Sequence, residues 1–129
     1  MPSGFSPSDT RALQGATSYH DGLAAEDAVE RHYLHQGYTL AERRWRGQGG
    51  EIDLILRDGR GFVFVEVKKA RTHARAAERL SSRQLQRICA SGEDYCGQKA
   101  PGRFVDMRID LATVDATGQI NVLPNISQY

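Results

Sequence analysis

Two apolar runs joined by a turn constrain the fold of this chain more than any other feature of its 129 residues. The runs cover residues 50–55 (GEIDLI) and 62–68 (FVFVEVK), and the dipeptide Asp58-Gly59 lies between them. Asp-Gly between two apolar segments is a strong signal for a β-hairpin. Both runs also contain acids, and carboxylates are rarely buried in strands unless a partner neutralises them. The segment therefore predicts a hairpin whose acids need a partner.

The length of the turn sets which residues face each other across this hairpin. A loop of residues 59–60 and a loop of residues 58–61 give the same register. In that register Asp53 faces Glu66 and Glu51 faces Lys68. Directly opposed Cβ atoms in an antiparallel pair lie about 4.5–5.5 Å apart. The hairpin therefore predicts that Asp53 and Glu66 meet.

The two faces of the hairpin differ in character, because successive side chains of a strand point to opposite sides. One face is wholly apolar and must be covered by other elements; it carries Ile52, Leu54, Leu56, Val63, Val65 and Val67. The other face is apolar near the turn and charged at its far end; it carries Glu51, Asp53, Ile55, Phe64, Glu66 and Lys68. A slip of one residue would move the acids into the apolar layer, so the pattern favours this register.

Asp53 opposite Glu66 places two negative charges side by side, which destabilises a sheet unless a cation lies between them. Clustered carboxylates are the ligands that Mg²⁺ and Mn²⁺ prefer. An ammonium at Lys68, on the same face, would hold or polarise a water molecule beside the metal. The alternative is a solvent-facing sheet end in which Lys68 neutralises Glu51 and Glu66. We favour the metal site because the acids interrupt an otherwise apolar segment.

Charge and composition leave several partner classes open. A formal net charge of +1 is no global signature of nucleic-acid binding. Basic residues are nevertheless concentrated on both sides of the hairpin: Arg43, Arg44 and Arg46 before it, and Lys68, Lys69, Arg71, Arg75, Arg79, Arg83 and Arg87 from its end onward. Such local patches predict phosphate contacts. Ordinary solvated arginines are the alternative for each of them.

The length predicts a single domain, covering residues 21–129 after a flexible tail of residues 1–20 that is rich in Ser, Gly, Pro and Thr. Cys89 and Cys96 are too few for a metal motif or a disulfide framework and are expected to be core thiols. No stretch is long and apolar enough for a signal peptide or a membrane span. We therefore expect a cytoplasmic protein.

The expected elements follow the order αβββαββ. Their bounds are a helix from about Asp21 to Gln36, a strand at 38–45, the two strands of the hairpin, the second of which ends near Lys69, strands at 102–114 and 119–123, and a helix after an N-cap at Ser81 or Ser82. Residues 71–80 fit either a loop or a short helix. The first helix carries an apolar stripe of Leu23, Val29, Tyr33 and Leu34, with Glu26 at its edge. The second is expected to bury Leu85, Ile88, Cys89 and Tyr95.

The arrangement of an acid on the first helix, an Asp on one strand and Glu-x-Lys on the next resembles the PD-(D/E)xK nuclease superfamily. Within it, the chain is similar to the YraN-like family of small bacterial proteins, which is grouped with Holliday-junction-resolvase-like nucleases. The residues that carry the resemblance are Gly22-x-x-Ala25-Glu26, Gly37-Tyr38, 50–55, 63–68, Arg83-Gln84, Arg87-Ile88 and Arg108-Ile109-Asp110. It implies a restriction-endonuclease-like α/β domain with a mixed central sheet flanked by helices.

The resemblance also implies roles for individual residues. Asp53 and Glu66 would ligate Mg²⁺ or Mn²⁺, with the Val67 carbonyl as a further ligand, and Lys68 would orient or deprotonate the attacking water. Glu26 would reach the metal directly or through water, and Gln84 would lie near the scissile phosphate. The nucleic-acid contacts would come from Arg43, Arg44, Arg46, Lys69, Arg71, Arg83 and Arg87. Arg44 departs from the family, where many members have Asn, and residues 68–71 shift the basic residue that usually follows the Lys.

The expected function is therefore metal-dependent endonucleolytic hydrolysis of DNA, with branched DNA as one candidate substrate. By analogy with resolvases, which make two symmetric cuts, a homodimer is expected. Two alternatives come from other classes of protein. One is a non-catalytic nucleic-acid-binding module, and the other is a protein-interaction subunit whose acidic cleft is structural.

Overall fold

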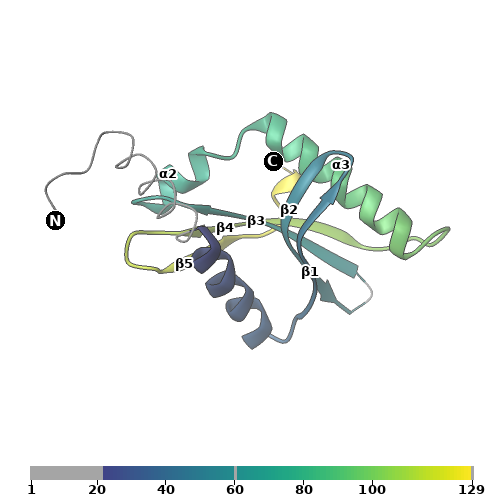
Figure 1. The fold of residues 1–129 in the computed structure, drawn as a ribbon, viewed down its shortest axis with the longest axis horizontal. Helices are drawn as coiled ribbons and strands as arrows, with labels where there is room; N and C mark the ends of the chain where they lie inside the picture. Colours follow the sequence, from purple (N-terminus) through teal and green to yellow (C-terminus); the bar gives the residue numbers. More distant parts are fainter. Residues whose placement is uncertain (1–21, 60, 129) are drawn as a thin grey trace, which may run out of the picture.

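The structure, a computed structural model, describes residues 22–59 and 61–128 (Figure 1). The predicted tail, residues 1–20, and the predicted helix start at Asp21 lie outside these ranges. The first helix covers residues 22–35. It is followed by β1 (Thr39–Gly47), β2 (Gly50–Asp58), β3 (Gly61–Lys69), α2 (His73–Glu78), α3 (Ser82–Lys99), β4 (Met107–Val114), β5 (Ile120–Leu123) and the 3₁₀ turn η1 (Ile126–Gln128). The predicted order αβββαββ is confirmed, and α2 is a short helix in the segment that the sequence left open.

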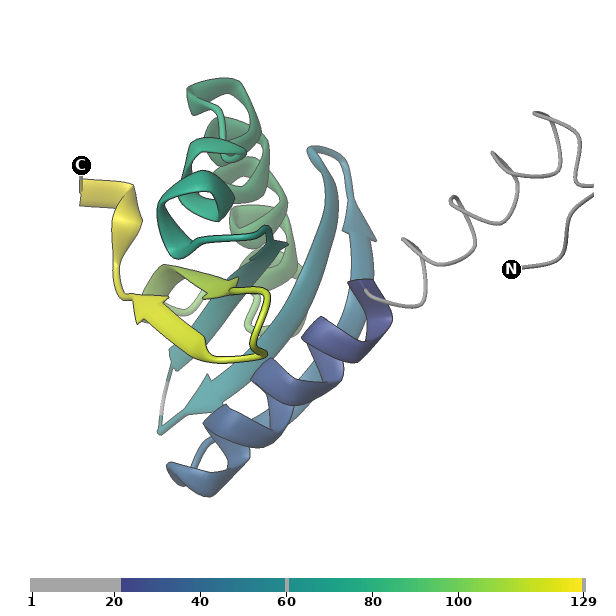
Figure 2. The ribbon, with the colours of Figure 1, turned by 90° about the vertical axis from the view of Figure 1, so that its left-hand side faces the viewer.

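The five strands form one mixed sheet in the order β1-β2-β3-β4-β5. Neighbouring strands are antiparallel except for β3 and β4, which are parallel. A parallel pair needs a long crossover, and α2 and α3 supply it. Figure 2 shows the first helix on one face of the sheet and α2 and α3 on the other. The fold is therefore a three-layer α/β domain.

Each face of the sheet has its own apolar cluster. The first helix places Ala25, Val29 and Tyr33 against Leu54 and Val65, so this face of the hairpin is buried as predicted. On the other face, Ile55 and Phe64 pack with Ile88 and Tyr95 of α3. Asp58 faces Gly61 and Leu54 faces Val65, which confirms the predicted register near the turn. Gly59 adopts a φ of 58°, as a tight hairpin turn requires.

The first helix ends as its sequence predicts. The N–H groups of Gly37 and Tyr38 donate to the carbonyl oxygens of Leu34 and Tyr33, at 3.1 and 3.2 Å. This is the Schellman arrangement, and Gly37 supplies its left-handed residue with a φ of 97°. The predicted apolar stripe is wrong at Leu34, which is exposed. Ala25 takes a place in the stripe instead, because it lies on the same side of the helix as Val29.

The second long helix, α3, begins at the predicted N-cap. The hydroxyl of Ser81 accepts the Gln84 N–H at 3.0 Å. The set of residues that α3 buries differs from the prediction. Leu85 and Cys89 are only half-buried, whereas Ser91 and Gly92 are fully covered. A Cβ on Gly92 would come within 3.1 Å of the Phe64 ring, so a small residue allows α3 to approach the sheet.

Two further expectations concern the end of α3 and the strand after it. Residues 102–106 are not part of β4, contrary to the prediction, because Met107 already faces Phe62 near the start of β3, and β5 pairs only with the later part of β4, from Leu111 to Val114. Both cysteines are free thiols and half-buried. Among residues 22–59 and 61–128, no helix is both long and apolar enough to cross a membrane.

Candidate functional site

The hairpin ladder stops where the two acids were predicted to face each other. The last paired residues of β2 and β3 are Leu54 and Val65. Beyond them, a side chain replaces the backbone pairing between the two strands: Asp53 Oδ2 accepts a hydrogen bond from the Val67 N–H at 2.8 Å. The predicted ladder position of Glu51 opposite Lys68 does not occur, since the β2–β3 ladder ends at Leu54, and Glu51 is paired only with Arg46 of β1. The strands therefore part at Asp53, and the opening between them is the candidate site.

Contacts with α3 draw the end of the β1–β2 hairpin away from β3. Figure 1 shows this end curving up against α3. Gly49 lies so close to the helix that a Cβ there would be 2.3 Å from the Arg87 carbonyl oxygen. The hydroxyl of Ser91 donates to the Gly50 carbonyl at 2.9 Å. The bend also brings Ile52 into the cluster around Tyr95, so the prediction that Ile52 shares a face with Leu54 is wrong.

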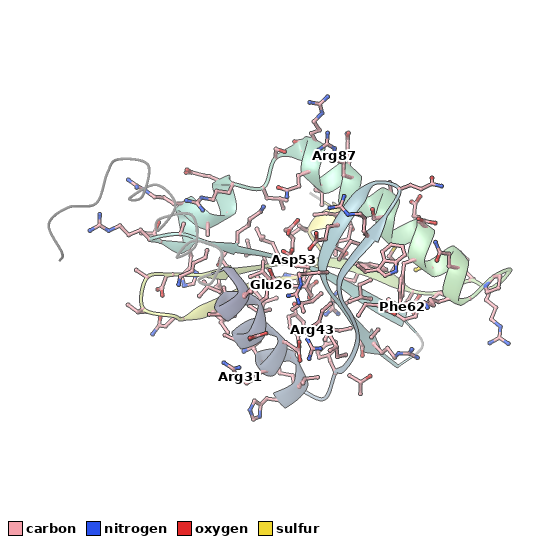
Figure 3. The ribbon with its side chains drawn as sticks, viewed as in Figure 1. Glu26, Arg31, Arg43, Asp53, Phe62 and Arg87 are labelled. Carbon is pink, nitrogen blue, oxygen red and sulfur yellow. The ribbon has the colours of Figure 1, made fainter. Side chains whose placement is uncertain are left out.

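Between the parted strands lies a cleft with a volume of about 410 Å³. Because the sheet is open here, the helices on both of its faces reach the same cleft. Its walls include every residue predicted as catalytic or metal-binding: Glu26, Asp53, Glu66, Val67, Lys68 and Gln84. Lys69 and Arg87, predicted to contact nucleic acid, line it as well. Figure 3 shows Glu26 and Asp53 near each other at the centre of the molecule, with Arg87 on α3.

Glu66 and Asp53 form a close acid pair. Glu66 is only 5% exposed. Burial raises its pKa to about 9, and a hydrogen bond to Asp53 and the charge of Asp53 act in the same direction, while Lys68 opposes them. The amide of Gln84 donates to Glu66 Oε2 at 3.2 Å. The surroundings therefore favour the protonated form of Glu66 more than solvent does.

Glu26 lies beside this pair, on the first helix. Burial raises its pKa, and the charge of Asp53 raises it further. Arg44 acts in the opposite direction through an ion pair at 3.2 Å. Within the described residues, no group of three or more His, Cys, Asp or Glu side chains is arranged to hold a metal ion. The charge of Glu26 therefore affects the pKa of Glu66, but Glu26 is not a third member of the acid pair.

The arginines of β1 are engaged with acids. Arg43 binds Glu30 through two hydrogen bonds of 2.6 and 2.8 Å, and Arg46 lies 3.7 Å from Glu51. Arg44 has a φ of 46°, in a region where Asn is better suited than Arg, which fits the Asn that the resemblance expects there. By contrast, no acid of the described residues lies within ion-pair distance of Lys69, Arg71, Arg83 or Arg87.

A second buried acid, Asp110 on β4, was not predicted as important from the residues themselves. Its carboxylate is fully buried and accepts hydrogen bonds from three residues. Arg108 donates twice, at 2.9 and 3.1 Å, the Tyr33 hydroxyl donates at 2.7 Å, and the Asn125 N–H donates at 3.0 Å. Arg108 also donates to the Tyr38 hydroxyl. These contacts tie the first helix and the C-terminal segment to the sheet, so their role is structural.

Small residues around the cleft were also overlooked. Gly22, Ala25, Gly49 and Gly50 line it beside the predicted side chains. Residues 47–50 (GQGG) join β1 to β2. The glycines directly before Glu51 were the available signal that the backbone comes close to another element there.

The fold and the site together define a single α/β domain with a buried acid pair at the point where two strands part. The chain belongs to the family described as Uncharacterised protein family UPF0102, which matches residues 25–114. That segment contains every predicted catalytic and metal-binding residue. The predicted membership of the YraN-like family is confirmed.

Curated relatives match the chain over nearly its whole length. It is 48% identical over 117 residues to a UPF0102 protein of Roseobacter denitrificans, covering 91% of each chain. It is 45% identical over 113 residues to a UPF0102 protein of Cereibacter sphaeroides, covering 88% of this chain and 97% of that relative. A UPF0102 protein of Ruegeria pomeroyi is 46% identical over 114 residues, with 88% and 93% covered.

Proposed function

We propose that this protein is a metal-dependent nuclease that hydrolyses phosphodiester bonds of DNA, with branched DNA as a candidate substrate. The observation that carries the proposal is the acid pair Asp53 and Glu66, which shares one cleft with Lys68, Gln84 and Glu26. Paired carboxylates next to a lysine, in a cleft that opens between two strands, are the groups that metal-assisted hydrolysis requires.

The acid pair fits a divalent cation by its charge and chemistry. Glu66 is buried, which is the main cause of its raised pKa, and the negative charge of the half-buried Asp53 beside it raises this pKa further. Asp53 and Glu66 would hold Mg²⁺ or Mn²⁺, the Val67 carbonyl would be a further ligand, and Glu26 would bind through water. When bound, the metal ion would make a coordinated water acidic and stabilise charge on the phosphate.

The other residues of the cleft have separable roles in this proposal. Lys68 brings a positive charge next to Glu66, where it would orient the attacking water and stabilise the hydroxide that forms. Gln84, already hydrogen-bonded to Glu66, would fix the rotamer of that carboxylate and donate to a phosphate oxygen. The Val67 N–H holds the Asp53 carboxylate in place before any ligand arrives. A backbone hydrogen bond therefore orients one of the two proposed metal-binding carboxylates.

The test is cleavage by the wild type and by Asp53→Asn. Both would be incubated with linear, flapped and four-way DNA and with structured RNA, in Mg²⁺ or Mn²⁺. The Asn oxygen still accepts the Val67 N–H, so we expect Asp53→Asn to fold normally and to lose metal-dependent cleavage. Cleavage by the variant at the wild-type rate would show that the site is assigned wrongly.

A matched control is Asp58→Asn, which removes an exposed acid from the same strand outside the cleft. It should cleave like the wild type. The second candidate function is a nucleic-acid-binding module without turnover, and the lack of a three-acid cluster within the described residues favours it. It predicts salt-sensitive DNA binding, no cleavage of any substrate, and little effect of Asp53→Asn on binding.

A further inference from the structure

A second groove continues the acid cleft along the end of β3. The two share Gly22, Val67, Lys68 and Lys69 in their walls. The second groove, with a volume of about 460 Å³, then runs over the residues that join β3 to α2 and past the end of α2. A ligand lying across Asp53 and Glu66 therefore has an uninterrupted path onto this surface.

The walls of this groove are basic, whereas those of the cleft are mainly acidic. Its charged residues are Lys68, Lys69, Arg71 and Arg79, and within residues 22–59 and 61–128 no acid lines it. Among the described residues, no acid lies within ion-pair distance of these side chains. This separates them from Arg43, Arg44 and Arg46 of β1, which are all paired with acids. Among the described cations that line the cleft and this groove, those without an acid partner thus lie at the end of β3, in the segment around α2 and on α3.

The position of Arg79 is set by the fold. Its Nη1 donates to the Lys69 carbonyl oxygen at 2.9 Å, so the guanidinium is held over the end of β3. The helix that carries it, α2, is attached to the sheet through His73. The ring of His73 lies 2.7 Å from the Thr113 hydroxyl and 3.5 Å from the Asp115 carboxylate. Arg79 is therefore presented from an anchored element.

The opposite end of the cleft offers no comparable path. There the turn between β1 and β2 packs onto α3, where Gly49 lies against the Arg87 carbonyl and Ser91 bonds to Gly50. A long chain that enters the cleft would meet packed backbone on that side. The basic groove is the side on which it can continue.

We propose that this groove binds the phosphodiester backbone of a nucleic-acid strand next to the phosphate held at Asp53 and Glu66. The inference rests on the proposed function and adds to it the route of the strand. Lys69, Arg71 and Arg79 would contact successive phosphates, since a polyanion is the ligand that matches a row of cations without acids. Arg79, which is not among the nucleic-acid contacts that the family resemblance implies, would be one of the binding residues.

The experiment measures binding separately from cleavage. The affinity of a fluorescein-labelled single-stranded DNA oligonucleotide would be determined by anisotropy in EDTA, over a series of salt concentrations. The proteins compared would be the wild type, Arg79→Gln and Arg75→Gln. Arg75 is an exposed arginine on the same short helix but outside the groove, so it is the matched control. Circular dichroism would verify that all three fold alike.

We expect Arg79→Gln to lower the slope of log affinity against log salt by about 0.7, the value for one phosphate contact on a single strand, and Arg75→Gln to leave it unchanged. Arg71→Gln, which leaves the Arg79–Lys69 hydrogen bond intact, should lower the slope similarly. Equal effects at positions 75 and 79, no effect at 79 and 71, or no binding by the wild type would each overturn the proposal. Because EDTA removes any metal, these outcomes do not depend on whether Asp53→Asn abolishes cleavage.

Discussion

Two buried acids of the described residues, Asp110 and Glu66, are placed in opposite surroundings. Asp110 is surrounded by donors: the Arg108 guanidinium, the Tyr33 hydroxyl and the Asn125 N–H all bond to it. Among the described residues, Glu66 has another acid as its neighbour, and its favourable partners are the Gln84 amide and the charge of Lys68. The first carboxylate is surrounded by hydrogen-bond donors, whereas the second has a like charge beside it.

This difference shows how a structural acid is distinguished from a functional one. Burial of a charge is costly unless it is paired, and Asp110 meets that condition with groups from three residues, Tyr33, Arg108 and Asn125. Glu66 and Asp53 do not, yet they lie in an open cleft. An acid pair that costs stability is retained where it has a task, which is the physical reason for assigning function to the cleft.

Removing the charge of Asp110 should have the largest effect on stability. Asp110→Asn leaves Arg108 without its carboxylate, and we expect the free energy of unfolding to fall by about 3 kcal/mol. Urea denaturation followed by circular dichroism would measure this. A loss below about 1 kcal/mol would mean that the Asp110 contacts are not a structural centre.

Adding a metal ion should stabilise the protein through the acid pair only. At Mn²⁺ concentrations about a hundred times the dissociation constant, the gain would be about 2.7 kcal/mol in the wild type. The gain should vanish in Asp53→Asn and in Glu66→Gln, and should persist in Tyr33→Phe, which alters only the Asp110 side. Thermal unfolding with and without Mn²⁺ is the measurement. Equal gains in all four proteins would place the metal elsewhere.

The stability of the metal-free protein should depend on pH through Glu66. Its pKa is raised from 4.5 to about 9 in the folded state, so within this window the folded state holds a proton that the unfolded chain has lost. Stability therefore falls as pH rises, by at most about 1.4 kcal/mol per pH unit. The control is Glu66→Gln, which cannot titrate. Urea titrations in EDTA from pH 5.5 to 8.5 would show whether the two proteins diverge; parallel curves would contradict the raised pKa.

The smallest effects should come from single hydrogen bonds at the two sites. Tyr33→Phe removes one buried donor to Asp110 and should cost about 1–2 kcal/mol. Gln84→Ala removes the half-exposed donor to Glu66 and should cost less than about 0.5 kcal/mol. Both can be measured by the same denaturation assay. The reverse order would mean that the cleft, and not the Asp110 side, is important for stability.

Local patterns predicted the elements that bear the site. The turn at Gly59 and the alternation of apolar residues predicted the register, which holds from Asp58 opposite Gly61 to Leu54 opposite Val65. Gly37 and Ser81 marked helix ends correctly. These features depend on neighbours in sequence or on one adjacent strand, so they can be inferred without knowledge of the rest of the fold.

Errors arose where distant segments decide the outcome. The parting of β2 from β3 depends on contacts of Gly49 and Ser91 some forty residues apart, and the burial of Ile52 follows from it. The partners of the β1 arginines are also distant in sequence, since Arg43 and Arg44 bind acids of the first helix. The sequence shows where basic residues cluster. It does not show which of these residues form ion pairs with acids in the folded protein.

By itself, the sequence determined that Asp53 and Glu66 would meet, because a two-residue alternation and one tight turn leave a single register that keeps acids out of the core. The tertiary structure decided what surrounds them. Only the packing of two helices on opposite faces of an opened sheet brings Glu26 and Gln84 into one cleft and leaves Lys69, Arg71 and Arg79 facing outward along a groove. Long-range packing sets these positions, since each is the sum of many contacts between segments that lie far apart in the chain.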